Sequence, residues 1–166
     1  MSREGTAEFH PDHAILRFER RLAHAPERVW AAITEPGQIE AWWGRATVDL
    51  TPGGTMRIEW LNTDEDANSV TMPASITELD PPRLLEIEGE PHGTLRFELE
   101  PDGDGTLLRF TTRSQIPDEF RAKVLAGWHF HLDALGDFLD DGRRIDWPNW
   151  PQDRWQAIHD GHYAGV

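Results

Sequence analysis

Eight histidines are the residues of this sequence best suited to acid–base chemistry or to metal binding. His129 and His131 stand two residues apart in a stretch with helical periodicity, so their side chains point roughly 200° apart and cannot share one ion. His129 and Asp133 have i, i+4 spacing and could bind an ion weakly, while His159 and His162, at i, i+3, have no apparent third ligand. We therefore expect no metal site among the histidines.

The spacing of Asp64, Asp66 and Asn68 matches the start of a calcium-binding loop. However, Ser69 stands at the sixth position of that loop and Ser75 at the twelfth, where glycine and glutamate are needed. The pattern therefore indicates a solvated loop between two strands.

Nucleophiles and cofactor motifs are also missing from the sequence. There is no cysteine, which excludes disulfides, thiolate zinc sites and cysteine nucleophiles, and no serine lies in a Gly-x-Ser-x-Gly turn. Lys123, the sole lysine, follows an alanine rather than a glycine-rich loop, and residues 103–105 (GDG) lack the third glycine of a dinucleotide-binding motif. We expect no cofactor and no catalytic set, which favours a role other than that of an enzyme.

His131 has the greatest chemical interest because it falls inside the apolar stripe of a long predicted helix. It is interpreted in three ways: a core histidine with one hydrogen bond, a polar group that orients a ligand in a cavity, or a general acid or base. The acidic residues stand on the outward phase of the predicted strands, so no carboxylate partner is evident, which weakens the third interpretation.

Large apolar side chains suggest a binding site of a different kind. Several of them stand in the inward phase of the predicted elements, where they could line a cavity for a small, flat or aliphatic apolar ligand. The alternative is that they fill the space as ordinary core. Together with His131, the candidate ligand-binding residues are Trp42, Trp60, Met72, Phe97, Phe110 and Trp128.

The elements that must position these residues follow from hydrophobic periodicity. Residues 13–22 alternate as a strand, two short helices start near Pro26 and Pro36, and six strand-like runs with hairpin-length connections follow. A helix is predicted over residues 117–140, and it ends at Gly142. The pattern predicts an α+β fold: an antiparallel sheet of about seven strands, with the long C-terminal helix covering its apolar face.

The C-terminal tail is rich in tryptophan and stands next to an unexplained phenylalanine. Phe130 points away from the apolar stripe of the long helix and needs cover. Trp147, Trp150 and Trp155 could fold back over it, or it could form a homodimer interface. We expect a single domain over residues 1–166, with its core at about 13–142 and the tail at 143–166.

Five segments resemble a known family. They are residues 25–36 (APERVWAAITEP), 39–44 (IEAWWG), 49–54 (DLTPGG), 76–84 (ITELDPPRL) and the pair 127–128 (GW). Together they resemble the START-like helix-grip (SRPBCC) superfamily, and more narrowly the branch related to the C-terminal domain of the activator of the heat-shock-protein-ninety ATPase. The resemblance implies a curved sheet wrapped around the long helix, with an apolar cavity between them.

The superfamily includes lipid carriers, polyketide cyclases and aromatases, and chaperone activators, so the fold does not settle the function. The sequence favours binding of a small apolar ligand, with a cyclase- or aromatase-like enzyme or a chaperone-linked, stress-related interaction protein as alternatives. A formal net charge of −14 disfavours nucleic acid and anionic membranes as partners. Residues 1–11 lack the apolar stretch of a signal peptide, so we expect a cytoplasmic protein.

Overall fold

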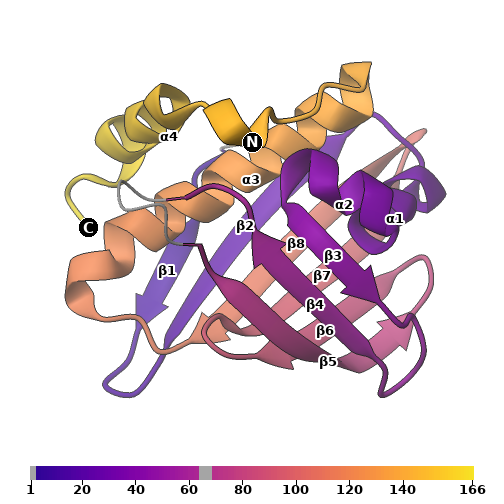
Figure 1. Cartoon of the computed structure of the whole chain (residues 1–166), viewed down its shortest axis with the longest axis horizontal. Coiled ribbons are helices and arrows are strands. Elements are labelled where there is room, and N and C mark those ends of the chain that lie inside the picture. Colours follow the sequence, from indigo (N-terminus) through magenta and orange to yellow (C-terminus); the bar gives the residue numbers. More distant parts are fainter. Residues whose placement is uncertain (1–2, 64–68) are drawn as a thin grey trace.

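The computed structural model describes residues 3–63 and 69–166. Within them, the strands form one antiparallel eight-stranded sheet in the order β1-β2-β8-β7-β6-β5-β4-β3 (Figure 1). The strands are β1 (Thr6–Phe9), β2 (Ala14–Leu22), β3 (Gly44–Val48), β4 (Thr55–Trp60), β5 (Thr71–Asp80), β6 (Leu84–Gly89), β7 (Gly93–Asp102) and β8 (Gly105–Ser114).

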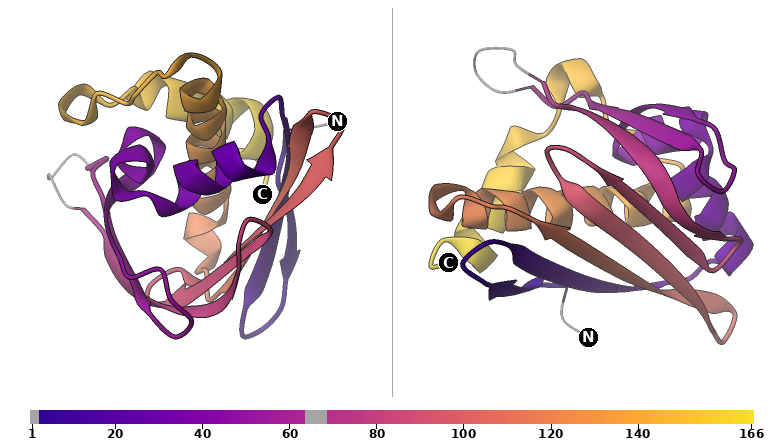
Figure 2. Two further views of the ribbon diagram at one scale, coloured as in Figure 1. Left: turned by 90° about the vertical axis from the view of Figure 1, so that its right-hand side faces the viewer. Right: turned by 90° about the horizontal axis from the view of Figure 1, so that it is seen from below.

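The helices lie on the inner side of this sheet, which curves around α3 (Figure 2). In Figure 1 the pair α1 and α2 lies beside one end of α3, while α4 runs along the outer side of α3. Their bounds are α1 (Pro26–Thr34), α2 (Pro36–Trp42), α3 (Arg121–Asp141) and α4 (Gln152–Ile158), with 3-10 turns at Asp118–Phe120 and Trp147–Asn149 and a π-helical turn at His159–Tyr163. The expected α+β helix-grip fold is therefore confirmed. None of the described helices is long and apolar enough to span a membrane.

Local sequence explains most of these boundaries. Pro26 and Pro36 each occupy the first turn of a helix. A backbone N–H at this position has no acceptor within the helix, so proline, which lacks the N–H, costs no hydrogen bond there. Gly142 ends α3 with a left-handed φ of 76°, a conformation that glycine adopts without a steric penalty. The strands alternate between buried apolar and exposed polar residues, as in a sheet with one solvated face.

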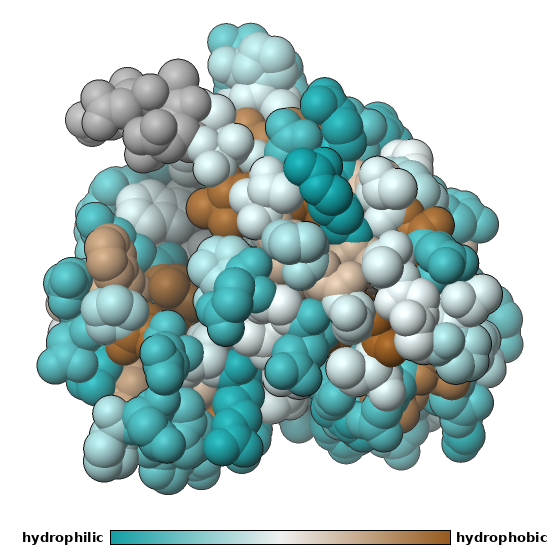
Figure 3. All heavy atoms as spheres, turned by 60° about the horizontal axis from the view of Figure 1, so that its bottom comes forward, coloured by the Kyte–Doolittle hydropathy of each residue, from teal (hydrophilic) through white to brown (hydrophobic). Residues whose placement is uncertain are grey.

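The outer face of the sheet is charged, with both signs side by side. Arg96 shows the arrangement: its Nε lies 2.8 Å from a Glu98 carboxylate oxygen and its Nη1 lies 2.9 Å from one of Glu86. Figure 3 shows a surface on the sheet side of the molecule that is largely hydrophilic, with apolar side chains scattered through it. Mixed charges of this kind mark a solvated surface.

β1 is an eighth strand that the sequence did not predict, because the first expected strand covered residues 13–22. It pairs with β2, with Thr6 opposite Arg17. Contacts from distant residues hold it there: the Arg20 Nη1 donates to the Arg3 carbonyl at 2.7 Å, and the Gly5 N–H donates to the Tyr163 hydroxyl at 2.7 Å. A four-residue strand fixed by such contacts leaves almost no periodic signal.

Candidate functional site

An open pocket of about 870 Å³ lies where the end of β4, the middle of α3 and the C-terminal tail meet. Its walls are largely aromatic, and its rim carries polar side chains from α4 and from the residues after β4. The aromatic walls are Trp60, Trp128, Trp150 and Trp155. The other lining residues are Asn62, Thr63, Val70, His92, Lys123, Val124, Gly127, His131, Gln152, Asp153, Gln156 and His159.

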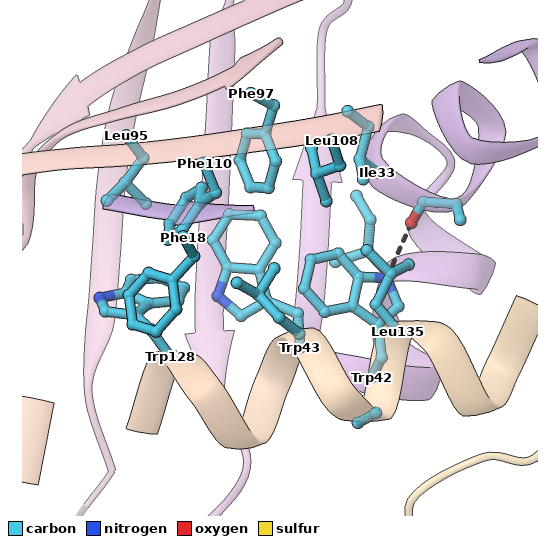
Figure 4. Close-up of a cluster of buried hydrophobic side chains, with 14 of the residues drawn as sticks. Phe18, Ile33, Trp42, Trp43, Leu95, Phe97, Leu108, Phe110, Trp128 and Leu135 are labelled. Carbon is cyan, nitrogen blue, oxygen red and sulfur yellow. Dashed lines mark hydrogen bonds between the residues drawn. The ribbon is translucent and has the colours of Figure 1, made fainter. Parts of the chain in front are cut away.

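The structure divides the seven candidate ligand-binding residues into two groups. Trp60, Trp128 and His131 line the pocket. The other four are fully buried in the core between the sheet and the helices, where several of them are seen in Figure 4: Trp42, Met72, Phe97 and Phe110. Of these, Trp42 is fixed by a hydrogen bond from its indole N–H to the Ala32 carbonyl at 2.9 Å.

Aromatic side chains of the core pack against the two tryptophans that line the pocket, Trp60 and Trp128. Trp43 lies between the two groups: its ring centroid is 5.7 Å from that of Trp60 and 6.0 Å from that of Trp128, both in edge-to-face geometry. Phe110 also packs on Trp128, with centroids 4.8 Å apart. Aromatic pairs at such distances stabilise one another and hold the indoles in fixed orientations. The wall formed by Trp60 and Trp128 is therefore preformed.

His131 lies between the core and the pocket. Its Nδ1 is 2.9 Å from the Trp42 carbonyl oxygen, which can only accept, so Nδ1 carries the proton. The side chain is 3% exposed, and burial lowers the pKa of the imidazole from 6.5 to about 4. At neutral pH His131 is therefore an uncharged ring whose Nε2 is a hydrogen-bond acceptor.

His92 is a second pocket histidine that sequence reasoning missed. It lies in the connection between β6 and β7, where its ring packs 4.6 Å from Trp60 and 5.8 Å from Trp128, centroid to centroid. Burial lowers the pKa of His92 to about 4, so this imidazole is also neutral at pH 7. In the sequence it stands between Pro91 and Gly93, a turn signal that does not show which way the side chain points.

The C-terminal tail is the third wall of the pocket. The Trp150 ring packs edge-to-face on Phe130, 5.8 Å between centroids, which confirms that the tail covers this exposed position of the helix. The Trp150 indole N–H donates to the Thr63 carbonyl at 3.2 Å, and that of Trp147 donates to the Glu40 carbonyl at 2.7 Å. Cover of Phe130 by the tail was one of the two interpretations of the sequence, whereas the contribution of the tail to a pocket was not expected.

The metal candidates fare differently from the pocket residues. Within residues 3–63 and 69–166, the structure brings no three His, Cys, Asp or Glu side chains together in a way that could hold an ion. His129 Nε2 does lie 3.4 Å from Asp133, but Arg20 contacts the same carboxylate at 3.4 Å. Asp64, Asp66 and Asn68 lie outside the described residues.

Comparison with known proteins places the chain in a family context. Residues 23–140 match the model of the family described as activator of Hsp90 ATPase homolog 1-like protein. No curated protein sequence matches the chain.

Solved structures share the fold at low sequence identity. CalU16 from Micromonospora echinospora is 22% identical over 98% of this chain and 96% of its own, with a TM-score of 0.68. EF2215 from Enterococcus faecalis, a conserved protein of unknown function, is 22% identical over 95% of this chain and 89% of its own, with a TM-score of 0.66. DynU16, from the dynemicin biosynthetic locus, is 20% identical over 80% of this chain and 50% of its own, with a TM-score of 0.65.

Proposed function

We propose that this chain, which belongs to the family of activator of Hsp90 ATPase homolog 1-like proteins, binds a small apolar molecule in the pocket between β4, α3 and α4. The observation that carries the proposal is the preformed aromatic wall of Trp60 and Trp128, which are held by the core side chains behind them and also line the open pocket. Concave pockets of a few hundred to a thousand cubic ångströms, with aromatic walls and polar groups that orient the ligand, are typical small-molecule sites.

The charges around the pocket fit a neutral ligand. His92 and His131 are uncharged at pH 7, and the charged side chains among the described lining residues are Lys123 and Asp153, both exposed. A charged ligand would lose solvation on entering and would find no buried counter-ion among these residues. An uncharged aromatic or aliphatic molecule meets no such cost.

Two glycines of α3 allow a matched test. Gly127 lines the pocket and Gly136 does not, and a Cβ built on either meets no atom within 4 Å. Gly127→Leu therefore adds a side chain on the pocket side of α3 whose Cβ meets no other atom, while Gly136→Leu makes the same change two and a half turns further along the helix. Both substitutions raise helix propensity, so neither is expected to unfold the protein.

The assay is a fluorescence titration with N-phenyl-1-naphthylamine, an uncharged probe that brightens in apolar surroundings. We expect saturable binding to the wild type and to Gly136→Leu, and at least tenfold weaker binding to Gly127→Leu. Equal binding to all three proteins would place the probe elsewhere and contradict the proposal.

The family description suggests a second candidate, a chaperone-linked interaction role. The same variants separate the two functions, because a contact with a chaperone elsewhere on the surface does not depend on this pocket. Stimulation of a chaperone ATPase by the wild type and equally by Gly127→Leu would support the interaction role.

A further inference from the structure

The pocket holds hydrogen-bond acceptors that the protein itself leaves unused. The Nδ1 of His131 is committed to the Trp42 carbonyl, which leaves the Cδ2–Nε2 edge of the ring for the pocket, and Nε2 has no hydrogen-bond partner among the described residues. The Asn62 Oδ1, at the rim, is buried and likewise accepts no hydrogen bond from them. A buried acceptor without a donor is costly, so the Asn62 Oδ1 points to a ligand that supplies one, and the Nε2 of His131 is a second acceptor available to the same ligand.

The surroundings of these acceptors are flat and aromatic. The rings of His131 and His92 both pack near the Trp128 indole, with centroids 6.1 and 5.8 Å from it. The ring plane of Trp60 is roughly perpendicular to that of Trp128, with an interplanar angle of 74°, so the two indoles form a corner of the pocket. A planar ring system fits against such walls by stacking and edge-to-face contact, which a flexible alkyl chain cannot match.

Resting on the proposed function, we propose that the pocket selects planar aromatic molecules that carry a hydroxyl group, which donates a hydrogen bond to Nε2 of His131. A ligand ether or carbonyl oxygen cannot make this contact, because it has no hydrogen to donate to a neutral imidazole nitrogen. A carboxylate is disfavoured for the same reason and by the net charge of −14. The low pKa of His131 keeps Nε2 unprotonated throughout the neutral range.

The test compares 2-naphthol with 2-methoxynaphthalene, which has the same ring system and lacks the donor. Equilibrium dialysis at pH 7 measures the dissociation constant of each. We expect the wild type to bind 2-naphthol about tenfold more tightly than 2-methoxynaphthalene, the difference of about 1.4 kcal/mol that one hydrogen bond contributes.

His131→Asn is the diagnostic variant. The asparagine amide reaches the position of Nδ1 and can still donate to the Trp42 carbonyl, but nothing replaces Nε2. We expect the variant to remain folded by circular dichroism and to bind both probes with equal affinity. His24→Asn is the matched control: His24 pairs with Asp140 on the surface, away from the pocket, and its loss should leave the tenfold preference intact.

The outcomes separate this inference from the proposed function. Equal binding of the two probes by the wild type, or a preference that survives in His131→Asn, overturns the hydroxyl contact while the pocket remains a binding site. If 2-naphthol does not bind, the inference is wrong, and the titration with N-phenyl-1-naphthylamine decides the proposed function on its own.

Discussion

His131 should make the protein less stable in mild acid, and the size of the effect follows from its burial. The pKa of its imidazole is about 4 in the folded protein, against 6.5 for an unperturbed histidine. At a pH between these two pKa values, His131 is therefore protonated in the unfolded chain and neutral in the folded chain. Stability contributed by neutral His131 is present above pH 6.5 and is lost as the pH falls from 6.5 towards 4.

One pKa unit corresponds to 1.36 kcal/mol, so this residue alone removes about 2 kcal/mol of unfolding free energy between pH 7 and pH 4.5. His92 has the same direction of shift for the same reason, and its charge also disfavours protonation of His131. The acidic groups whose pKa is lowered, such as Asp133, titrate below 3.8 and lie outside this window.

The assay is urea unfolding, followed by tryptophan fluorescence, at half-unit steps from pH 4.5 to pH 8. His131→Asn removes the titrating ring. Around pH 5, the unfolding free energy of the variant should therefore fall less steeply with decreasing pH than that of the wild type, and the difference in slope corresponds to one proton, near 1.4 kcal/mol per pH unit. Contributions from the other histidines cancel in this difference, except that of His92, whose charge is coupled to His131. Parallel curves for the two proteins would refute the assignment of His131 as a buried neutral imidazole.

Two further perturbations test how the chain termini are held. Tyr163→Phe removes the hydroxyl that accepts from the Gly5 N–H and bonds to the Nδ1 of His129 at 2.7 and 2.8 Å, and we expect a loss of about 1–3 kcal/mol in urea unfolding; no change would mean that this contact is not formed in solution. Trp150→Ala uncovers Phe130 and removes one pocket wall, so both the melting temperature and the affinity for N-phenyl-1-naphthylamine should fall; a fall in stability with unchanged affinity would show that the tail is cover alone.

The fold was predictable because its elements have strong periodic signals. Alternating strands such as residues 105–114, and a long helix that ends at Gly142, leave few arrangements open for a chain with hairpin-length connections. β1 was not predicted because it has only four residues, and the residues just before it, Arg3 and Gly5, are held by Arg20 and Tyr163, which are far away in sequence.

The site was predictable only in part, for a different physical reason. Periodicity shows that a side chain points inward, but it does not distinguish the centre of the core from the mouth of a pocket. Phe97 and Trp60 both lie on the inward phase of their strands, yet Phe97 is sealed in the core while Trp60 faces the pocket. His92 lies in a turn, where no period applies, and the turn alone does not indicate that its ring packs on two tryptophans.

The most direct test of ligand binding is native mass spectrometry of gently purified wild type and Gly127→Leu, each compared with its denatured form. We expect an additional mass on the native wild type that is absent after denaturation and absent from Gly127→Leu. An unliganded native spectrum for the wild type, or the same additional mass on both proteins, would contradict a small-molecule site between β4, α3 and α4.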